Sequence, residues 1–178
     1  MVNHKVNHKT IELINSLKGK EKIKILFVCF GNICRSPGAE GIMKDFVRKN
    51  RRDADFYIDS AGLYGGHAGA LPDARMRKHA SMRGYSLDSR ARAFYPSADF
   101  LEFDMIIGMD EQNIRQLNLL AENDEERAKI FRMTDFCRKY AEYKEVPDPY
   151  YEGADGFELV LDLLEDAVGG LYEYCSKK

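Results

Sequence analysis

Residues 29–37 of the sequence combine residue types and a spacing that suit anion chemistry. The segment reads Cys-Phe-Gly-Asn-Ile-Cys-Arg-Ser-Pro, and its first cysteine, Cys29, stands six positions before Arg35. A cysteine thiolate is a nucleophile, and an arginine guanidinium presents a planar fork of donors that matches two phosphoryl oxygens. We therefore expect this segment to bind a phosphoryl group and to attack it.

The other residues of the segment predict how the anion is held. Gly31 and Asn32 accept positive φ angles at low cost, which lets backbone N–H groups turn inward as an anion-binding nest. Ser36 is expected either to cap the helix that follows or to turn its hydroxyl toward the sulfur of Cys29. The loop amides, the helix N-terminus and Arg35 should lower the pKa of Cys29 well below the free value of about 8.5.

The surrounding sequence predicts an α/β fold that places this segment at a ligand-binding edge. From residue 22 onward, short apolar runs alternate with segments of helical period, which is typical of a four-stranded parallel sheet with helices on both faces. Ligands bind such sheets at the carboxyl ends of the strands, where helix N-termini also lie, so a phosphate-binding loop between the first strand and the first helix is favoured. The expected strands are 23–28, 56–59, 104–107 and 128–133, and the expected helices are 37–47, 73–83, 110–122 and one from a cap at Asp155 to about 171.

Length and pattern predict a single domain preceded by an extension. The chain has 178 residues, 44% of them hydrophobic and 31% charged, which suits one compact domain. We expect residues 1–22 to be an N-terminal extension, a mobile tail that contains a short helix capped by Thr10 and ended near Gly19, and residues 23–178 to form the domain. Residues 122–127 are expected to be a solvated loop or helix end.

Composition excludes several classes of partner. Lys and Arg number 27 against 29 Asp and Glu, so no nucleic-acid partner is expected. No apolar run approaches the roughly 20 residues of a membrane span, and no signal peptide is seen, so we expect a cytoplasmic protein, with a monomer favoured. The four cysteines should be reduced thiols. Because zinc-finger spacing and a nucleotide P-loop pattern are both missing, we expect no metal and no cofactor.

Residues 29–37 match throughout the signature C-x-G-N-x-C-R-S-P, and the chain thereby resembles the low-molecular-weight protein tyrosine phosphatases. The resemblance covers about residues 23 to 176. It includes Asp-Ser-Ala-Gly at 59–62, Pro-Asp at 72–73, Ala-Arg at 91–92, Asp-Phe at 99–100, Gly-Met-Asp at 108–110 and Val-Pro-Asp-Pro-Tyr-Tyr at 146–151. It implies a four-stranded parallel sheet flanked by helices and the hydrolysis of phosphotyrosine without a metal.

The resemblance also implies the roles of individual residues. By match to Asp-Pro-Tyr-Tyr, Asp148 is the general acid and base, a choice that the residues alone do not make. Cys29 is the nucleophile that forms a phosphocysteine intermediate, and Arg35 clamps the phosphoryl oxygens. The residues expected to bind substrate are Phe30, Gly31, Asn32, Ile33, Cys34, Ser36, Tyr64, Tyr150 and Tyr151.

Two departures from the family pattern affect the loop and the pocket wall. In the family, Asn32, Ser60 and a histidine brace the loop, but Ser89 stands at the histidine position, so we expect an altered or incomplete network. Gly66 stands where the family often has Trp or Tyr, and His67 follows it. Tyr64 is a candidate substitute that would complete an aromatic slot for an aryl phosphate.

Three alternatives to a tyrosine phosphatase remain open. Thioredoxin-coupled arsenate reductases need two further neighbouring cysteines, whereas Cys137 and Cys175 are far apart in the sequence. Protein arginine phosphatases favour a small threonine where this chain has Ile33. A silent phosphate-binding or redox-sensing module would not need Asp148 beside the loop. Separately, Cys34 is a candidate redox partner that captures oxidised Cys29 as a disulfide.

Overall fold

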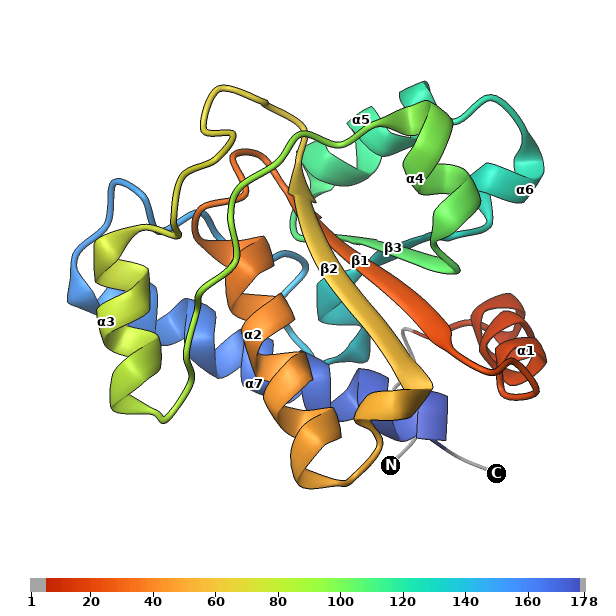
Figure 1. Ribbon diagram of the computed structural model, residues 1–178, viewed down its shortest axis with the longest axis horizontal. Coiled ribbons are helices and arrows are strands. Elements are labelled where there is room, and N and C mark those ends of the chain that lie inside the picture. The colour runs from red at the N-terminus through yellow and green to blue at the C-terminus, as the bar shows by residue number, and fades with distance from the viewer. Residues whose placement is uncertain (1–5, 177–178) are drawn as a thin grey trace.

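The computed structural model describes residues 6–176 and shows an α/β fold built on one parallel sheet (Figure 1). The sheet has four strands in the order β2-β1-β3-β4. Every strand pair is parallel, which confirms the predicted fold class. The strands are β1 (Ile23–Cys29), β2 (Phe56–Gly62), β3 (Met105–Gly108) and β4 (Ile130–Arg132).

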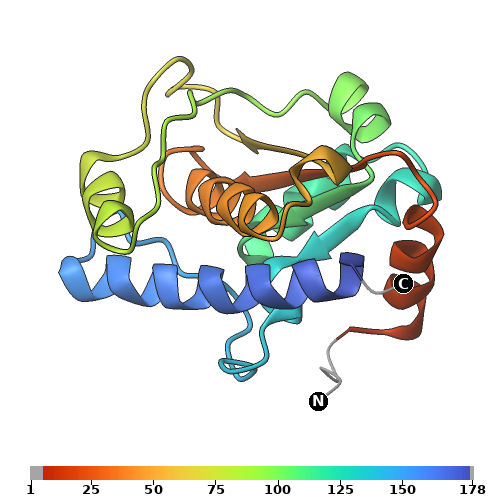
Figure 2. The ribbon, with the colours of Figure 1, turned by 60° about the horizontal axis from the view of Figure 1, so that its bottom comes forward.

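Helices cover both faces of the sheet. Figure 2 shows the long helix α7 running below α2 on one side of the strands, while α4 lies on the other side. The helices are α1 (His8–Leu17), α2 (Arg35–Lys49), α3 (Ala74–Met82), α4 (Pro96–Glu102), α5 (Glu111–Leu120), α6 (Asp124–Arg127) and α7 (Ala154–Ser176). Two 3₁₀ helices span Asp53–Asp55 and Met133–Phe136.

The central strand β1 is buried on both faces, which is why it reads as a continuous apolar run. Ile25 and Phe27 belong to the core that β1 shares with α2 and α7, whereas Leu26 and Val28 belong to the core under α4 and α5. β1 pairs with β2 on one side and with β3 on the other. The chain therefore changes its winding direction at β1, and the carboxyl end of β1 is the topological switch point.

Two elements differ from the sequence-based prediction. Helix α4 was not predicted, because its seven residues contain one buried apolar side chain, Phe100, and so carry no helical period. The fourth strand is shorter than expected, since Met133 already begins a 3₁₀ helix. Within the expected loop at 122–127, the structure has the short exposed helix α6.

The ends of the helices follow capping chemistry, with two corrections. Asp73 caps α3, and Asp110 caps α5 in a capping box with Asn113. Helix α7 begins at Ala154, so Asp155 lies in its first turn and not at the predicted cap. The cap of α1 is Asn7, whose side chain accepts from the backbone N–H of Thr10, and not Thr10 itself.

The N-terminal helix is part of the packed structure. Ile14 and Leu17 of α1 are buried in the core that contains α7, and Val6 is buried there too. Lys20 pairs with Asp104 at 2.6 Å between Nζ and Oδ1. The predicted mobile tail is therefore wrong from Val6 onward, and residues 1–5 lie outside the described range. Within residues 6–176, no helix combines the length and the apolar composition that a membrane crossing requires.

Candidate active site

The predicted phosphate-binding loop connects the end of β1 to the start of α2. Cys29 is the last residue of β1 and Arg35 the first residue of α2. Cys34, at the cap position, makes no side-chain capping hydrogen bond. The first N–H groups of α2 therefore remain available to an anion in the loop, where the positive end of the helix dipole also lies.

The hydroxyl of Ser36 lies next to the sulfur of Cys29. The distance between Ser36 Oγ and Cys29 Sγ is 3.0 Å, and both residues are buried. Ser36 lies in the first turn of α2 and does not cap the helix. Of its two predicted roles, the structure therefore supports the one in which its hydroxyl faces the sulfur of Cys29. A hydroxyl at this distance can donate to a thiolate and stabilise its charge.

The backbone of the loop confirms the prediction for Asn32 and corrects the one for Gly31. Asn32 has a φ of 56°, in the left-handed region, but Gly31 is not among the residues with positive φ. Gly31 matters for a different reason, because a Cβ there would lie 3.1 Å from Cδ2 of His67, and the ring would have to shift slightly away. The glycine thus permits His67 to approach the loop closely.

The guanidinium of Arg35 is buried and oriented by two other loops. Its Nη1 donates to Asp110 Oδ2 at 2.6 Å and to the carbonyl oxygen of Val146 at 3.1 Å. Its Nη2 lies 3.6 Å from Asp148 Oδ2. Burial disfavours the charged form, but Cys29, Asp110 and Asp148 outweigh it, and the pKa of Arg35 is raised above its ordinary value. Arg35 is thus a permanent cation beside Cys29.

Asp110 was missed by the sequence analysis, which assigned it only to a matched motif and to the start of a helix. Its carboxylate also caps α5 by accepting from the N–H of Asn113. One signal was available, since Asp110 follows β3 at the same edge of the sheet as Cys29. Polar residues just beyond the carboxyl ends of neighbouring strands meet in space.

The carboxylate of Asp148 faces the cavity from a loop that is itself anchored. Its Oδ1 accepts from the N–H of Tyr150 at 3.0 Å, and its side chain is 48% exposed. Arg75 Nη2 donates to the carbonyl oxygen of Tyr150 at 3.0 Å and pairs with Asp73 Oδ2, also at 3.0 Å. The backbone N–H of Asp73 in turn donates to the carbonyl of Ile33 at 2.7 Å. These contacts tie the loop that carries Asp148 to the phosphate-binding loop.

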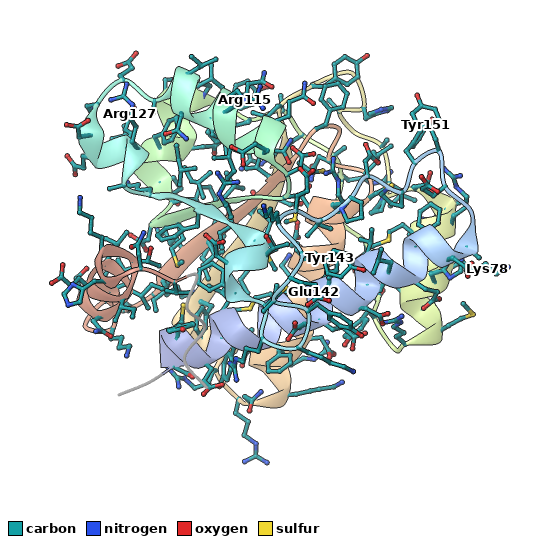
Figure 3. The ribbon with its side chains drawn as sticks, turned by 180° about the vertical axis from the view of Figure 1, so that it is seen from behind. Lys78, Arg115, Arg127, Glu142, Tyr143 and Tyr151 are labelled. Atoms are coloured by element: carbon teal, nitrogen blue, oxygen red, sulfur yellow. The ribbon has the colours of Figure 1, made fainter. Side chains whose placement is uncertain are left out.

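A cavity of about 240 Å³ brings most of the predicted site residues together. Tyr151, 92% exposed, stands at its rim with the ring directed outward (Figure 3). His67 is an unpredicted part of the wall. The lining residues are Cys29, Phe30, Gly31, Ile33, Cys34, Arg35, His67, Asp148, Tyr150 and Tyr151.

Three residues predicted to bind substrate do not line this cavity. Asn32 and Ser36 are buried behind the loop. Tyr64 stacks on Phe30, with ring centroids 5.2 Å apart and planes 4° apart. The phenol of Tyr64 also fills the space into which a side chain at Gly66 would project. Tyr64 therefore packs against Phe30 and supports the wall of the cavity from outside.

Ser60 is hydrogen-bonded to Asn32 of the loop and to the carboxylate of Glu40. Asn32 Nδ2 donates to Ser60 Oγ at 2.9 Å, and Asn32 Oδ1 accepts from the N–H of Arg92 at 3.0 Å. Ser60 Oγ donates to Glu40 at 2.5 Å. In the described part of the chain, Ser89 forms no hydrogen bond with these residues, although it lines a cavity of about 230 Å³ together with Glu40. The network is thus altered, with a carboxylate bound to Ser60.

The other three cysteines have settings unlike that of Cys29. All four are free and buried. Burial, followed by the charges of Asp73 and Cys29, raises the pKa of Cys34 well above its ordinary value. Burial also raises the pKa of Cys175 to about 12. The thiols of Cys34 and Cys175 therefore stay protonated near neutral pH.

A cysteine at the switch point of a parallel sheet, inside an anion-binding loop that an arginine completes, defines the class of cysteine-dependent phosphatases. The comparisons with known proteins narrow this class. Residues 24–178 match the model of the low molecular weight phosphotyrosine protein phosphatases, and the chain belongs to that family.

Relatives of known sequence or structure cover nearly the whole family region. A Synechocystis protein, provisionally named a low molecular weight protein tyrosine phosphatase, is 46% identical over 158 residues, which is 88% of this chain and 98% of that protein. The crystal structure of an Entamoeba histolytica protein tyrosine phosphatase has a TM-score of 0.82 at 44% identity, covering 85% of this chain and 96% of that one. A Drosophila arginine phosphatase has a TM-score of 0.79 at 31% identity, covering 88% of this chain and 99% of that one.

Proposed function

We propose that the protein hydrolyses phosphotyrosine in proteins, or related aryl phosphates, through a phosphocysteine intermediate on Cys29. The convergence of Cys29, Arg35 and Asp148 on one aromatic-walled cavity carries this proposal. The nucleophile and the cationic clamp lie on the loop, and the carboxylic acid enters from a second loop. This is the arrangement that phosphoryl transfer with a poor leaving group needs.

In the first step, the Cys29 thiolate attacks phosphorus and the bond between phosphorus and the tyrosyl oxygen breaks. Asp148, in its protonated form, gives its proton to that oxygen as tyrosine leaves. The guanidinium of Arg35 and the loop N–H groups hold the three equatorial oxygens of the phosphoryl group. Asp110 supports this step by keeping Arg35 oriented.

In the second step, water hydrolyses the phosphocysteine. The Asp148 carboxylate takes a proton from the water as it attacks phosphorus, and the Cys29 thiolate leaves. The hydroxyl of Ser36, 3.0 Å from Cys29 Sγ, stabilises the departing thiolate. Inorganic phosphate is the product, and the protonated Asp148 is ready for the next cycle.

The walls of the cavity favour an aryl ester. Phe30 and Tyr150 offer flat apolar surfaces, and Ile33 narrows the floor where an arginine phosphatase would carry a smaller polar residue. Initial rates on phosphotyrosine, phosphoarginine and phosphoserine peptides, measured with EDTA present, test this preference. We expect the phosphotyrosine peptide to be hydrolysed fastest and EDTA to leave its rate unchanged.

Three results of that experiment would contradict the proposal. A higher rate on the phosphoarginine peptide would indicate an arginine phosphatase, like the Drosophila neighbour. The proposed role of Cys29 as nucleophile would be unaffected. Loss of the phosphotyrosine rate in EDTA would mean that a metal takes part. No turnover of any peptide would favour a silent phosphate-binding module.

Asp148→Asn is expected to lower kcat/KM, which reports the first chemical step, by about 10²-fold for phenyl phosphates with poor leaving groups. An amide cannot donate the proton that a basic phenolate needs, whereas a very acidic phenol leaves without it. A series of substituted phenyl phosphates should therefore show a steeper dependence of kcat/KM on leaving-group pKa in the variant. Asp155→Asn, a change just beyond the same loop, serves as the control. Equal slowing across the series would show that Asp148 is not the acid.

We further propose that Cys34 protects Cys29 from overoxidation. Both cysteines line the same cavity. Peroxide would oxidise the Cys29 thiolate to a sulfenic acid and release hydroxide. The sulfur of Cys34 would then attack the Cys29 sulfur while its proton passes to the leaving hydroxyl, so that a disulfide forms and one water is released. Cys34 itself resists direct attack, because its raised pKa keeps it protonated.

Cys34→Ala should make inactivation by peroxide irreversible to dithiothreitol, whereas the parent protein should recover. Peptide mass mapping should find a disulfide between positions 29 and 34 in the parent and a sulfinic acid at Cys29 in the variant. The same treatment with phosphate present should slow both reactions, because the anion covers Cys29. If the variant recovers as fully as the parent, the protective disulfide is wrong.

We propose that the protein acts in the cytoplasm as a monomer, without nucleic acid or cofactor. Four free cysteines suit a reducing compartment, and a net charge of −2 gives no electrostatic attraction for polyanions such as nucleic acids. A relay of the arsenate reductase type would need accessible cysteines close together. Cys137 and Cys175 are both buried, which disfavours that alternative.

A further inference from the structure

A chain of hydrogen bonds leads from Cys29 away from the cavity and ends at a buried carboxylate, Glu40. Glu40 belongs to α2 and is only 3% exposed. Its Oε1 accepts from Ser60 Oγ at 2.5 Å, and its Oε2 accepts from Lys44 Nζ at 2.6 Å. The mechanism above assigns no role to this group.

The donors and acceptors along the chain run in one direction. Asn32 Nδ2 donates to Ser36 Oγ at 2.8 Å and to Ser60 Oγ at 2.9 Å. At its other end, the amide accepts through Asn32 Oδ1 from the backbone N–H of Arg92, which favours the same orientation. Both serine oxygens thus accept from the amide, and each serine has a single proton left to donate.

The destinations of these two protons follow from their neighbours. The proton of Ser60 goes to Glu40, because an ionised carboxylate only accepts. The proton of Ser36 goes to Cys29, 3.0 Å away. By taking the proton of Ser60, an acceptor at position 40 keeps Ser60 Oγ as an acceptor for the N–H₂ group of Asn32. Together with the Arg92 contact, this holds the N–H₂ group toward both serines and leaves Ser36 free to donate to the sulfur.

We propose that Glu40 is a positioning residue that sets the direction of this hydrogen-bond chain and thereby keeps Ser36 as a donor to the Cys29 thiolate. The inference rests on the proposed role of Cys29 as nucleophile. Ser89 and Glu40 line a common cavity, and the Glu40 carboxylate reaches Ser60 directly. The same hydrogen bonds hold Asn32 at its φ of 56°. A change in their donor and acceptor order would therefore also disturb the backbone of the phosphate-binding loop.

Glu40→Gln tests the direction with almost no change in shape. The amide of the variant has one acceptor oxygen for two donors, Ser60 and Lys44. The Lys44 ammonium forms the stronger hydrogen bond because it is charged, so it occupies that oxygen. The N–H₂ group would then face Ser60 Oγ, which would meet two donors and have no acceptor for its own proton. We expect the rate of Cys29 alkylation by iodoacetamide at neutral pH, and kcat for p-nitrophenyl phosphate, to fall about tenfold each.

Removal of Lys44 should reverse that loss. In Glu40→Gln/Lys44→Met the amide oxygen is free to face Ser60, so both rates should return to within about twofold of the parent value. Asp45→Asn is the matched control, because Asp45 is a second buried acid of α2 and pairs with Arg48 and Lys49, away from the loop. It should leave both rates unchanged even if it lowers Tm.

Several outcomes would overturn the proposal. Parental alkylation and kcat in Glu40→Gln would show that Glu40 does not act on Cys29. Failure of Lys44→Met to restore the rates would remove the directional argument, since a packing defect would not be repaired by a second substitution. Alkylation does not depend on turnover, so a parent protein that hydrolyses no aryl phosphate would refute the proposed function and leave this test readable.

Discussion

Cys29→Ser should lower kcat for aryl phosphates by at least about 10⁴-fold, while vanadate and phosphate still bind. A serine hydroxyl is scarcely ionised at neutral pH, so the nucleophile is lost. Arg35, the loop amides and the first turn of α2 are unchanged and continue to hold an anion. Steady-state kinetics with p-nitrophenyl phosphate and calorimetric titration with vanadate measure the two quantities separately.

The control for this prediction is Cys137→Ala, which removes a buried thiol remote from the cavity. Its kcat should equal that of the parent at temperatures well below Tm. Turnover by Cys29→Ser within tenfold of the parent would rule out a phosphocysteine intermediate. If vanadate binding were lost as well, the Cys29 sulfur would be needed to keep the phosphate-binding loop in its anion-binding conformation.

Arg35→Lys should lower kcat/KM by about 10³-fold. The guanidinium can meet Asp110 and Val146 through Nη1 and still offer its remaining N–H groups to a phosphoryl group. A lysine ammonium is a single point of charge, and Asp110 would draw it away from the oxygens. The same kinetic assay measures this effect, and phosphate affinity should fall with it.

Arg48→Lys provides the comparison, since the exposed Arg48 lies on the same helix and pairs with Asp45, away from the cavity. We expect no change in kcat/KM for that variant. If Arg35→Lys retained a tenth or more of the parental value, charge alone would suffice and the bidentate clamp would be wrong.

The fold was predictable because its signals are local. The run at 23–28 is apolar on every side chain but Lys24, which indicates a strand buried on both faces, and it stands directly before a segment of helical period. The nine residues after it carry the chemistry in one stretch. Position 148 needed the family resemblance, since an Asp-Pro pair by itself indicates only a turn.

The missed parts of the site are contacts between residues far apart in the chain. Arg35 pairs with Asp110, which lies 75 positions further along the sequence. Ser60 of β2 donates to Glu40 of α2, which lies 20 positions earlier. No spacing rule links such pairs. Gly31 shows a second limit, because its role depends on the approach of the His67 ring and not on its own backbone angle.

The position of α1 determines how the protein can be tethered. β1 runs for about 20 Å from Ile23 to Cys29, and α7 runs for about 35 Å from the loop beside Asp148 to Ser176. Helix α1 packs beside the far end of α7, so the described chain ends, Val6 and Ser176, both lie away from the cavity (Figures 1 and 2). A fusion partner or an immobilising surface attached at either of these ends would leave the opening of the cavity accessible to a bulky polypeptide substrate.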